Sequence, residues 1–502
     1  MHFKLLPAAL TLSMLCACGS AVVNPVSGQT ELSAMSEADE IAEGRKAHQQ
    51  VLQEYSVYNN PAVQDYVNAL GQRLAAQSHR AHLQWHFTVL DSPEINAFAL
   101  PGGYVYVTRG IMAYMESEAD LAGVMGHEIG HVTARHGAQR ATSQQHAGLG
   151  VFAASILGAV LESQGVVGAG QMAGQVSQTV AAGYIASYGR EQELQADGLG
   201  AEYLARNHYD PHNMVDVITV LKNQERFAAD QAKVEGKPAP SGAGWLASHP
   251  SNDQRLQQIK QTADQYDAHT QYADEGRARY LKVIAGLSFG ESADQGLVRG
   301  RNFYHPGLGI ALTAPTGWRI QNTATQLALL NTVGDAALLL KPVPPAAGKT
   351  HAEVLRNGFK ATQGKSEAAS INGLQATRFS GTRQDAQGQA QALEVTLVSG
   401  PDDTIYVLQP AAKDATVLQA NRLALREAEG SFRAMTTQDR AAARPWRIQL
   451  QPFPKGGFAE LAKSSALPNA ERQLRLVNGV YSGGEPRPGQ LVKVVEAVRP
   501  AQ

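Results

Sequence analysis

The stretch that decides the fold of this chain is HEIGH, at His127–His131. Four residues advance an α-helix by little more than one turn, so His127 and His131 lie on one side of the helix and can each give a ring nitrogen to one Zn²⁺. Zinc lowers the pKa of a water molecule that it binds to about 7, and Glu128 stands beside that position to accept the proton. The spacing therefore predicts a hydrolytic zinc site with Glu128 as the general base.

The residues before this motif predict that it lies on a helix. Ser117 is a suitable N-cap, and the acidic residues Glu118 and Asp120 would occupy the first turn. Apolar residues then recur at helical spacing, namely Leu121, Val124, Met125 and Val132. A five-residue motif that arises by chance has no reason to carry this context, so we interpret it as functional.

A hydrolytic zinc ion also needs a third protein ligand and one open position. His136 is the nearer candidate, but the glycine and third histidine of the HExxHxxGxxH pattern do not fall at the required positions 134 and 137. The farther candidate is Glu193, which would share a helix face with Asp197. Asp197 could then orient a ligand histidine by accepting its other N–H. Glu191 is the alternative ligand if this helix is phased differently.

HExxH followed by an ExxxD pair at Glu193 and Asp197 resembles the gluzincin peptidases of the HtpX, BepA and CAAX-prenyl-protease type, and most closely the BepA-like periplasmic metalloproteases. The segment DSPEINAFALPGGYVYVT, at 91–108, is similar to the strand and turn that precede the active helix in these enzymes. The similarity extends over roughly residues 35–290. It implies a single zinc ion held by His127, His131 and Glu193, with Asp197 behind a ligand histidine.

His249 stands in the sequence Ser-His-Pro, which resembles a His-Pro segment near the end of BepA-like peptidase domains. We consider three interpretations. His249 could donate to the oxyanion of the tetrahedral intermediate, or it could fill the open zinc position and hold the enzyme shut. The third interpretation is a surface histidine without a role.

The N-terminus predicts export. Lys4 and the apolar run 5–15 are typical of a signal peptide, which we place at 1–17. The box ending at Cys18 resembles a bacterial lipobox and implies lipidation of Cys18 and sorting to the outer membrane; the alternative is an ordinary secretory signal in which Cys16 and Cys18 are incidental. Cys16 would be removed with the signal, so the mature chain could form no internal disulfide.

After the signal peptide, the chain is predicted to divide into four regions. Residues 18–35 are predicted to be a tether, 36–290 the peptidase domain, 296–440 a small α+β domain that loosely resembles the PsbP and Mog kind, and 445–502 a module similar to a degenerate LysM. The apolar tract 147–186 is predicted to be a core helical hairpin, or else a lid that contacts membrane or substrate. The predicted fold class is α+β, with a mainly helical zincin domain that carries a small sheet.

Together these features predict a zinc endopeptidase, anchored by lipid in the bacterial outer membrane and facing the periplasm. By resemblance, its substrates are misfolded or stalled envelope proteins, including outer-membrane β-barrels, and it would work beside the outer-membrane assembly machinery. The formal net charge of −2 offers no attraction to nucleic acid, so we expect no such partner. The alternatives are a chaperone or scaffold with a latched zinc site, and a binding protein tethered to peptidoglycan. We favour the enzyme because ligands, base and orienting carboxylate are all present.

Overall fold

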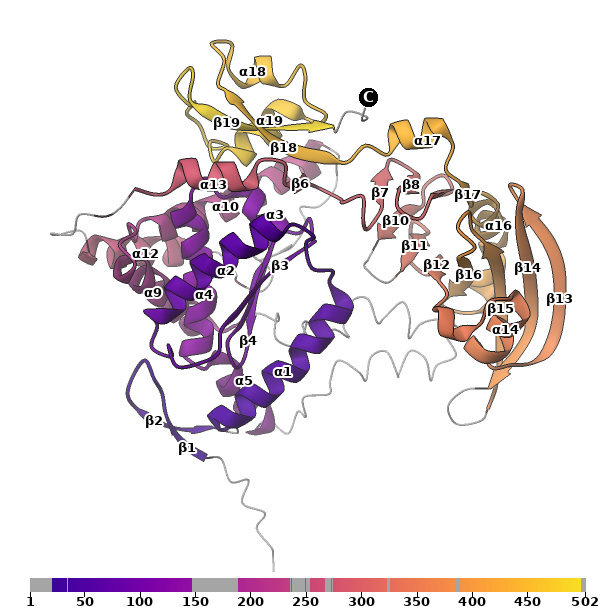
Figure 1. Cartoon of the computed structure of the whole chain (residues 1–502), viewed down its shortest axis with the longest axis horizontal. Helices are drawn as coiled ribbons and strands as arrows, with labels where there is room; N and C mark the ends of the chain where they lie inside the picture. Colours follow the sequence, from indigo (N-terminus) through magenta and orange to yellow (C-terminus); the bar gives the residue numbers. More distant parts are fainter. Residues whose placement is uncertain are drawn as a thin grey trace, which may run out of the picture.

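The structure is a computed structural model of the chain. It describes residues 20–33, 35–146, 188–234, 236, 249, 253–266, 272, 274–322, 326–384 and 389–497. The predicted signal peptide, Cys18 and the apolar tract 147–186 lie outside the described residues. Within them, the chain forms helices and several small sheets, which confirms the α+β class (Figure 1). No helix in this part of the chain is both long enough and apolar enough to cross a bilayer.

The first two helices each begin at a residue whose side chain caps the helix. The helix α1 (Glu37–Glu54) has a capping box in which the Ser36 side chain accepts from the Asp39 amide and Asp39 accepts from the Ser36 amide. The helix α2 (Pro61–Ala76) is capped by the side chain of Asn60, and its first residue is a proline that has no N–H to satisfy. Both helices bury one apolar face.

A small sheet follows, with strand order β3-β5-β4. Its strands are β3 (His86–Leu90), β4 (Ala97–Leu100) and β5 (Tyr104–Thr108), of which β3 runs parallel to β5 and β4 antiparallel to it. All residues of β4 and β5 are buried because helices cover the sheet. The edge strand β4 lies against the helix that carries the HExxH motif.

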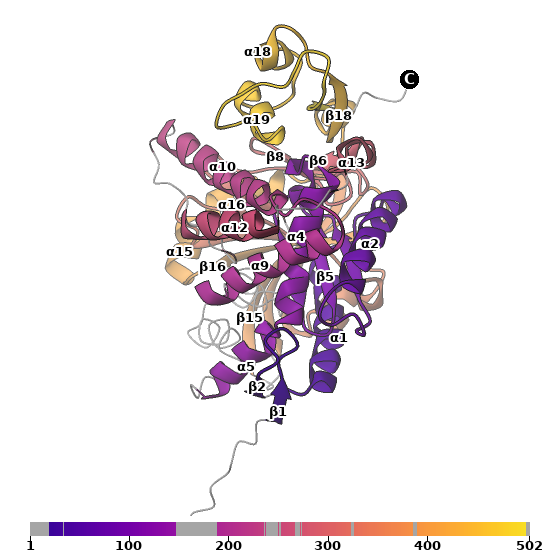
Figure 2. The ribbon, with the colours of Figure 1, turned by 90° about the vertical axis from the view of Figure 1, so that its left-hand side faces the viewer.

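That helix, α4 (Glu118–Thr133), is the centre of the domain, and every one of its residues is buried. The helices around it are α3 (Arg109–Tyr114), α5 (His136–His146), α9 (Arg190–Arg206), α10 (Asn213–Val234), α12 (Asp253–Tyr266) and α13 (Arg277–Ile284). Figure 2 shows α9 and α10 beside α4. A Cβ added at Gly126 would lie 3.3 Å from the Cα of Gly200, and one at Gly130 would lie 3.1 Å from the Cβ of Leu199. These glycines let α4 and α9 approach closely.

Residues 20–33 differ from the predicted tether. They form a hairpin of β1 (Ser20–Val23) and β2 (Thr30–Ser33), which pair antiparallel. Asn24 is buried at the turn, where its side chain accepts from the amides of Val26 and Ser27 and donates to the carbonyl of Ala134 at 3.4 Å. Polar contacts hold this hairpin against the end of α4, so the hydropathy pattern of the segment does not reveal it.

The middle of the chain forms a second body, built on a seven-stranded sheet with the order β10-β11-β12-β16-β15-β14-β13 and a four-stranded sheet β17-β9-β8-β7. The strands of the larger sheet are β10 (Arg319–Asn322), β11 (Leu327–Leu330), β12 (Ala336–Pro342), β13 (Ala361–Ile371), β14 (Leu374–Gln384), β15 (Ala390–Ser399) and β16 (Ile405–Ala412). Those of the smaller sheet are β7 (Leu297–Arg299), β8 (Asn302–His305), β9 (Ile310–Thr313) and β17 (Arg433–Ala434).

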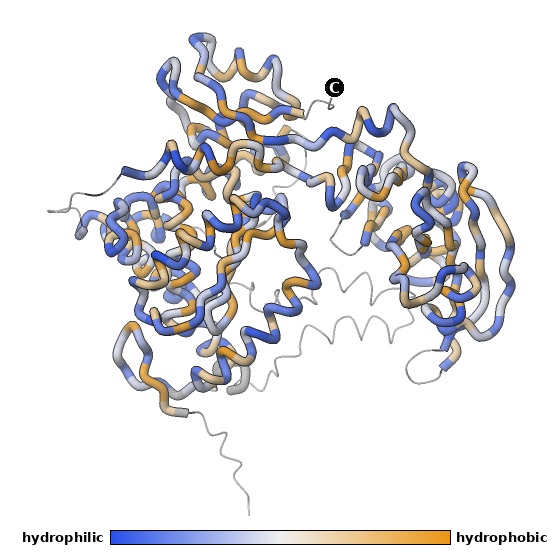
Figure 3. The backbone as a smooth tube through the Cα atoms, viewed as in Figure 1, coloured by the Kyte–Doolittle hydropathy of each residue, from blue (hydrophilic) through white to orange (hydrophobic). Residues whose placement is uncertain are grey.

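Short helical segments accompany these sheets, namely η1 (Pro345–Ala347), α14 (His351–Glu353), η2 (Val354–Gly358), α15 (Ala415–Ala420), α16 (Arg422–Gly430) and α17 (Thr437–Ala442). The helix α16 packs on the larger sheet through Leu425 and Ala428, and Phe432 follows into the same core. The outer strand β13 is mostly exposed and polar, whereas apolar residues line the inner strands (Figure 3). This pattern blunts the exposed edge of the sheet.

The C-terminal residues return to the peptidase domain. They form β18 (Trp446–Pro452), α18 (Gly457–Leu461), α19 (Ala470–Val477) and β19 (Leu491–Ala497). The strand β18 pairs with β19 on one side and, on the other, with β6 (Ser288–Phe289), which closely follows α13. Buried apolar residues of this region belong to the same core cluster as those around α4. The region therefore rests on the peptidase domain (Figure 1).

Candidate metal centre

Two helices bring the predicted metal ligands together. The helix α4 begins at Ser117, whose side chain accepts from the Asp120 amide at 3.0 Å, and it carries His127, Glu128 and His131 near its middle and end. The helix α9 contributes Glu193 from its first turn. Because α4 and α9 pack closely at their glycines, Glu193 faces the two histidines across the contact.

Four side chains surround one point. His127, His131, Glu193 and His249 each offer a ligand atom, and these atoms all lie within 4.8 Å of one another. The Nε2 atoms of His127 and His131 are 3.0 Å apart, and each is 3.6 Å from a carboxylate oxygen of Glu193. Ligands at 2.0–2.1 Å from a tetrahedral zinc ion are about 3.3–3.4 Å apart, so these spacings suit zinc.

The hydrogen-bond partners of the two histidines turn both Nε2 lone pairs toward that point. His127 Nδ1 lies 2.9 Å from an oxygen of Asp197 and donates to it, which leaves Nε2 as an acceptor. His136 Nε2 donates to Gln195 Oε1 at 2.9 Å, which makes His136 Nδ1 the acceptor for His131 Nδ1 at 2.8 Å. His131 Nε2 is then an acceptor as well. Two lone pairs 3.0 Å apart repel each other, and a cation between them relieves this repulsion.

The pKa values of the two carboxyl groups at the centre are shifted in opposite directions. Burial raises the pKa of Glu193 to about 7, and the nearby His127 and Arg255 offset this only in part. A divalent cation would keep Glu193 ionised. Burial also opposes the ionisation of Asp197, but the Arg255 guanidinium outweighs it and holds the pKa of Asp197 at about 2. Asp197 therefore stays charged and fixes the orientation of the His127 ring.

Sequence reasoning missed three residues of the centre. Arg255 is buried on α12, donates to both oxygens of Asp197 at 2.8 Å, and lies 3.1 Å from Glu193. Tyr188 stacks on His131 with the ring centroids 4.1 Å apart, and Gln195 fixes the tautomer of His136. No spacing rule points to Arg255 or Tyr188. Gln195 lies between the two acidic residues of the ExxxD pair, and that position is the signal the sequence offers for it.

The two rival ligands lie outside the cluster. His136 sits behind His131 and contacts its outer nitrogen, so it acts on the centre only through that ring. Glu191 is exposed on the solvent face of α9. Of these three candidates, Glu193 alone lies within the cluster.

His249 is the fourth member of the cluster, and its side chain is only 2% exposed, so it is not a surface histidine. Its Nδ1 lies 3.2 Å from His127 Nε2 and 2.9 Å from Glu193 Oε1, while its Nε2 lies 3.6 Å from Glu128 Oε1. Burial lowers the pKa of His249 to about 3, so the ring is neutral and can act as a ligand. His249 thus lies where it could serve as a fourth ligand to the same metal ion.

Residues 61–263 match the sequence profile described as peptidase family M48. This part of the chain is a peptidase M48 domain. The match covers α2, α4 and α9, and therefore all the predicted ligands, and it confirms the recognition of this peptidase type from HExxH and ExxxD. The description names a peptidase, which agrees with the class of hydrolase that the sequence predicts for this domain.

Curated relatives agree with this family. The beta-barrel assembly-enhancing protease of Yersinia pestis is 32% identical over 212 residues, which are 42% of this chain and 41% of the relative. The protein of the same name from Escherichia coli (strain K12) is 30% identical over 249 residues, 49% of this chain and 48% of the relative. The mitochondrial metalloendopeptidase OMA1 of Schizosaccharomyces pombe is 28% identical over 241 residues, 47% of this chain and 65% of the relative.

The chain spans about half the length of the bacterial relatives that it matches. The likeness to solved structures is low. The match to cyanobacterial PsbP from Synechocystis sp. PCC 6803 covers 28% of this chain and 98% of the PsbP chain, at 12% identity and a TM-score of 0.21.

Proposed function

We propose that this protein is a zinc-dependent endopeptidase of the bacterial cell envelope that degrades misfolded or stalled envelope proteins, including outer-membrane β-barrels. We further propose that it is anchored by a lipid on Cys18 in the outer membrane and faces the periplasm. The observation that carries the catalytic part is the convergence of His127, His131 and Glu193 at ligand spacing, with Glu128 beside them on α4.

The chemistry follows from the groups around the centre. A zinc ion held by His127, His131 and Glu193 would polarise the scissile carbonyl and lower the pKa of the attacking water. Glu128 accepts the proton of that water and can pass it to the leaving amine. Asp197 keeps the His127 ring in the tautomer whose Nε2 binds the metal, and Arg255 keeps Asp197 charged.

The burial of the centre supports an unfolded substrate. His127, Glu128 and His131 are at most 2% exposed, so a folded protein surface cannot bring its backbone to the metal. A small cavity of about 10 Å³ is lined by Leu100 of the edge strand β4, His131 and Tyr188. Relatives named beta-barrel assembly-enhancing protease support envelope proteins as the source of unfolded chains.

The test uses the full chain loaded with zinc and an unfolded outer-membrane β-barrel protein as substrate. Glu128→Gln should keep zinc and fold but lower the cleavage rate by about 10²–10⁴-fold, because the proton acceptor is gone. The same barrel protein, folded in detergent, serves as the matched control and should resist cleavage. Equal cleavage by the parent and the Glu128→Gln variant would exclude this mechanism, and equal cleavage of both substrate forms would exclude selection for unfolded chains.

A second candidate function is a chaperone or scaffold whose zinc site is latched. The observation in its favour is His249, which lies at ligand distance in the position needed by water and substrate. Under this proposal the Glu128→Gln variant would protect unfolded barrel proteins from aggregation as well as the parent does, and neither would cleave them. Peptidoglycan binding by residues 445–502 remains a prediction, which co-sedimentation with purified wall sacculi can test.

A further inference from the structure

The strand β19 carries a lysine in the shared core of the molecule. Lys493 has no exposed surface, although it is a charged residue on a strand whose neighbours are apolar. Its Nζ donates to the carbonyl oxygen of Ala113 at 3.0 Å and to that of Met115 at 2.7 Å, and it lies 2.7 Å from a carboxylate oxygen of Glu116. Three acceptors thus match the three hydrogens of the ammonium group.

All three acceptors lie at the end of α3 or in the turn between α3 and α4. The carbonyls of Ala113 and Met115 stand at the C-terminal end of α3, where a helix leaves carbonyl groups without intrahelical partners. A cation at this end of a helix satisfies those groups and interacts favourably with their dipoles. Arg277 adds a second connection, since its Nη2 donates both to Glu116 at 3.1 Å and to the carbonyl of Leu491 on β19 at 3.0 Å.

The same turn is joined rigidly to the helix of the metal centre. The carboxylate of Asp120, in the first turn of α4, accepts from the amides of Glu116 and Ser117 at 2.9 and 3.1 Å. Asn213 of α10 donates to the other oxygen of Asp120 at 2.8 Å. Two turns further along α4 stands His127. A displacement of the turn would therefore move the start of α4 and, with it, the ligand and base that this helix carries.

The choice of a lysine here is informative. Burying an ammonium group is costly, and a packed apolar side chain would stabilise the core at least as well. The ammonium, however, has directional partners, and it places the backbone of residues 113–116 at a defined position relative to β19. A buried charge that makes such contacts contributes to the specificity of the arrangement more than to its stability.

We propose that Lys493 is a positioning residue for the metal centre, through which the C-terminal region 446–497 holds the α3–α4 turn and thereby sets the place of α4. The proposal rests on the proposed function for its kinetic consequence, but its structural consequence can be measured without activity. It also makes the C-terminal region part of the catalytic unit rather than a separate module that could be removed.

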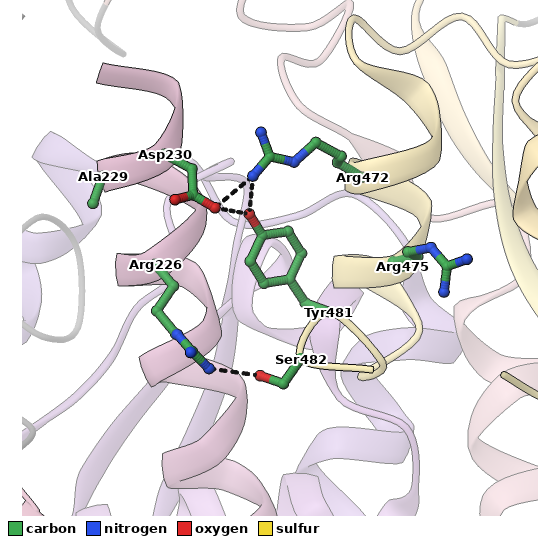
Figure 4. Close-up of a pocket in the computed structure, with 7 residues that line it drawn as sticks. All are labelled: Arg226, Ala229, Asp230, Arg472, Arg475, Tyr481 and Ser482. Atoms are coloured by element: carbon green, nitrogen blue, oxygen red, sulfur yellow. Dashed lines mark hydrogen bonds and ion pairs between the residues drawn. The ribbon is translucent and has the colours of Figure 1, made fainter. Parts of the chain in front are cut away.

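A second contact between the same two parts provides a comparison. Figure 4 shows the cavity of about 470 Å³ between α10 and the C-terminal region, where Arg472 contacts Asp230 and Tyr481, and Arg226 donates to Ser482 at 3.0 Å. The Arg472 and Asp230 side chains are 41% and 48% exposed. An exposed pair of this kind contributes little to stability, and it has no link to the α3–α4 turn. Asp230→Asn therefore weakens a contact between the same two parts of the chain without affecting the α3–α4 turn.

The experiment compares Lys493→Met with Val495→Ala in the full, zinc-loaded chain. Val495 is a matched control because it is fully buried on the same strand and belongs to the same core. Its side chain is apolar, so its replacement removes no hydrogen bond or ion pair to the α3–α4 turn. We expect Lys493→Met to lower kcat per folded molecule by about tenfold to a hundredfold with little change in KM, which is the scale of a 1 Å misplacement. Val495→Ala and Asp230→Asn should leave kcat per folded molecule unchanged.

Hydrogen exchange gives the readout that is independent of activity. In Lys493→Met the amides of residues 118–127 should exchange at least tenfold faster relative to those of α2, whereas Val495→Ala should change both helices alike. Equal effects of the two variants on exchange and on kcat per folded molecule would overturn the proposal and leave Lys493 a stabilising residue only.

If Lys493→Met does not fold, Glu116→Gln tests the same link. This variant removes only the charge partner of Lys493. Unchanged exchange in residues 118–127 of this variant would also overturn the proposal. If the parent protein is inactive but Lys493→Met still shows the expected difference in exchange, the proposed function is rejected and the positioning role of Lys493 stands.

Discussion

Arg255 and Asp197 form a bidentate salt bridge behind the metal centre, in which Arg255 Nε lies 2.8 Å from Asp197 Oδ2 and Arg255 Nη2 lies 2.8 Å from Asp197 Oδ1. Both side chains are buried, and the Arg255 Nη1 also donates to the backbone carbonyl of His249 at 3.2 Å. One guanidinium therefore connects the residue that orients His127 with the segment that carries His249. The orientation of a ligand and the position of the fourth side chain depend on the same group.

Replacement of Arg255 should uncouple these features. Arg255→Met leaves Asp197 buried without its cation, so we expect zinc affinity to fall by about 10–100-fold, the usual effect of losing a partner behind a ligand. Arg255→Lys should fall between the parent and the methionine variant, because an ammonium cannot contact both carboxylate oxygens in the planar geometry of a guanidinium. Competition with a zinc chelator gives the affinities. An Arg255→Met variant with the affinity of the parent would show that Asp197 orients His127 without help.

The zinc content of two variants should show whether Glu193 or His136 is the third ligand. Glu193→Ala removes a carboxylate from the cluster and should lose most of the bound zinc. His136→Ala should keep one zinc ion per chain at saturating metal, with an affinity reduced by at most about 10–100-fold, because it loses only the acceptor behind His131. Elemental analysis after gel filtration measures both. The opposite order of zinc loss would make His136 the ligand.

Substitution of His249 distinguishes a latch from an oxyanion donor. If the neutral ring fills the open metal position, His249→Ala should raise the cleavage of an unfolded substrate and the rate of self-cleavage. If the ring donates to the oxyanion, the same change should lower turnover by roughly 10²–10³-fold. Both rates can be followed on gels with the Glu128→Gln variant as background. Rates equal to those of the parent in both assays would leave His249 without either role.

Glu118 should make the stability of α4 depend on pH in the acid range. Burial alone would raise its pKa, but hydrogen bonds from Tyr209, Tyr66, Arg279 and Arg73 reverse this and lower it from the ordinary value of 4.5. A group with a depressed pKa in the folded state stabilises the protein above the unfolded pKa, and this contribution is lost as the pH falls through the folded pKa. Urea unfolding should therefore show Glu118→Gln to be less stable than the parent at pH 7, with the difference shrinking below pH 4.5. A difference that stays constant down to acid denaturation would exclude this linkage.

The lipid anchor is tested by the two cysteines of the signal region. Cys18→Ala should abolish labelling by a fatty-acid analogue and leave an unprocessed or soluble form, because Cys18 is the predicted acceptor of the lipid. Cys16→Ala should be processed and labelled normally, since Cys16 would be removed with the signal peptide. Labelling that depends on Cys16 instead would move the cleavage site.

Much of the peptidase core follows from local sequence. The caps at Ser36, Asn60 and Ser117 mark the starts of their helices because a side-chain oxygen satisfies the amides that a helix start leaves exposed. The pair His127 and His131 shares a helix face for purely periodic reasons. These features involve residues a few positions apart, so spacing alone is sufficient to predict them.

The tertiary structure decided the rest. Arg255, Tyr188 and His249 reach the centre from parts of the chain that no periodic pattern connects to α4. The hairpin 20–33 is held by polar contacts, and β18 completes a sheet with β6 from the peptidase domain, so the C-terminal region shares its core instead of forming its own. Such arrangements depend on which surfaces bury each other across hundreds of residues. The sequence by itself determined the chemistry of the ligands and the helix that carries them, whereas the packing of distant segments decided which charges, rings and carbonyls surround them.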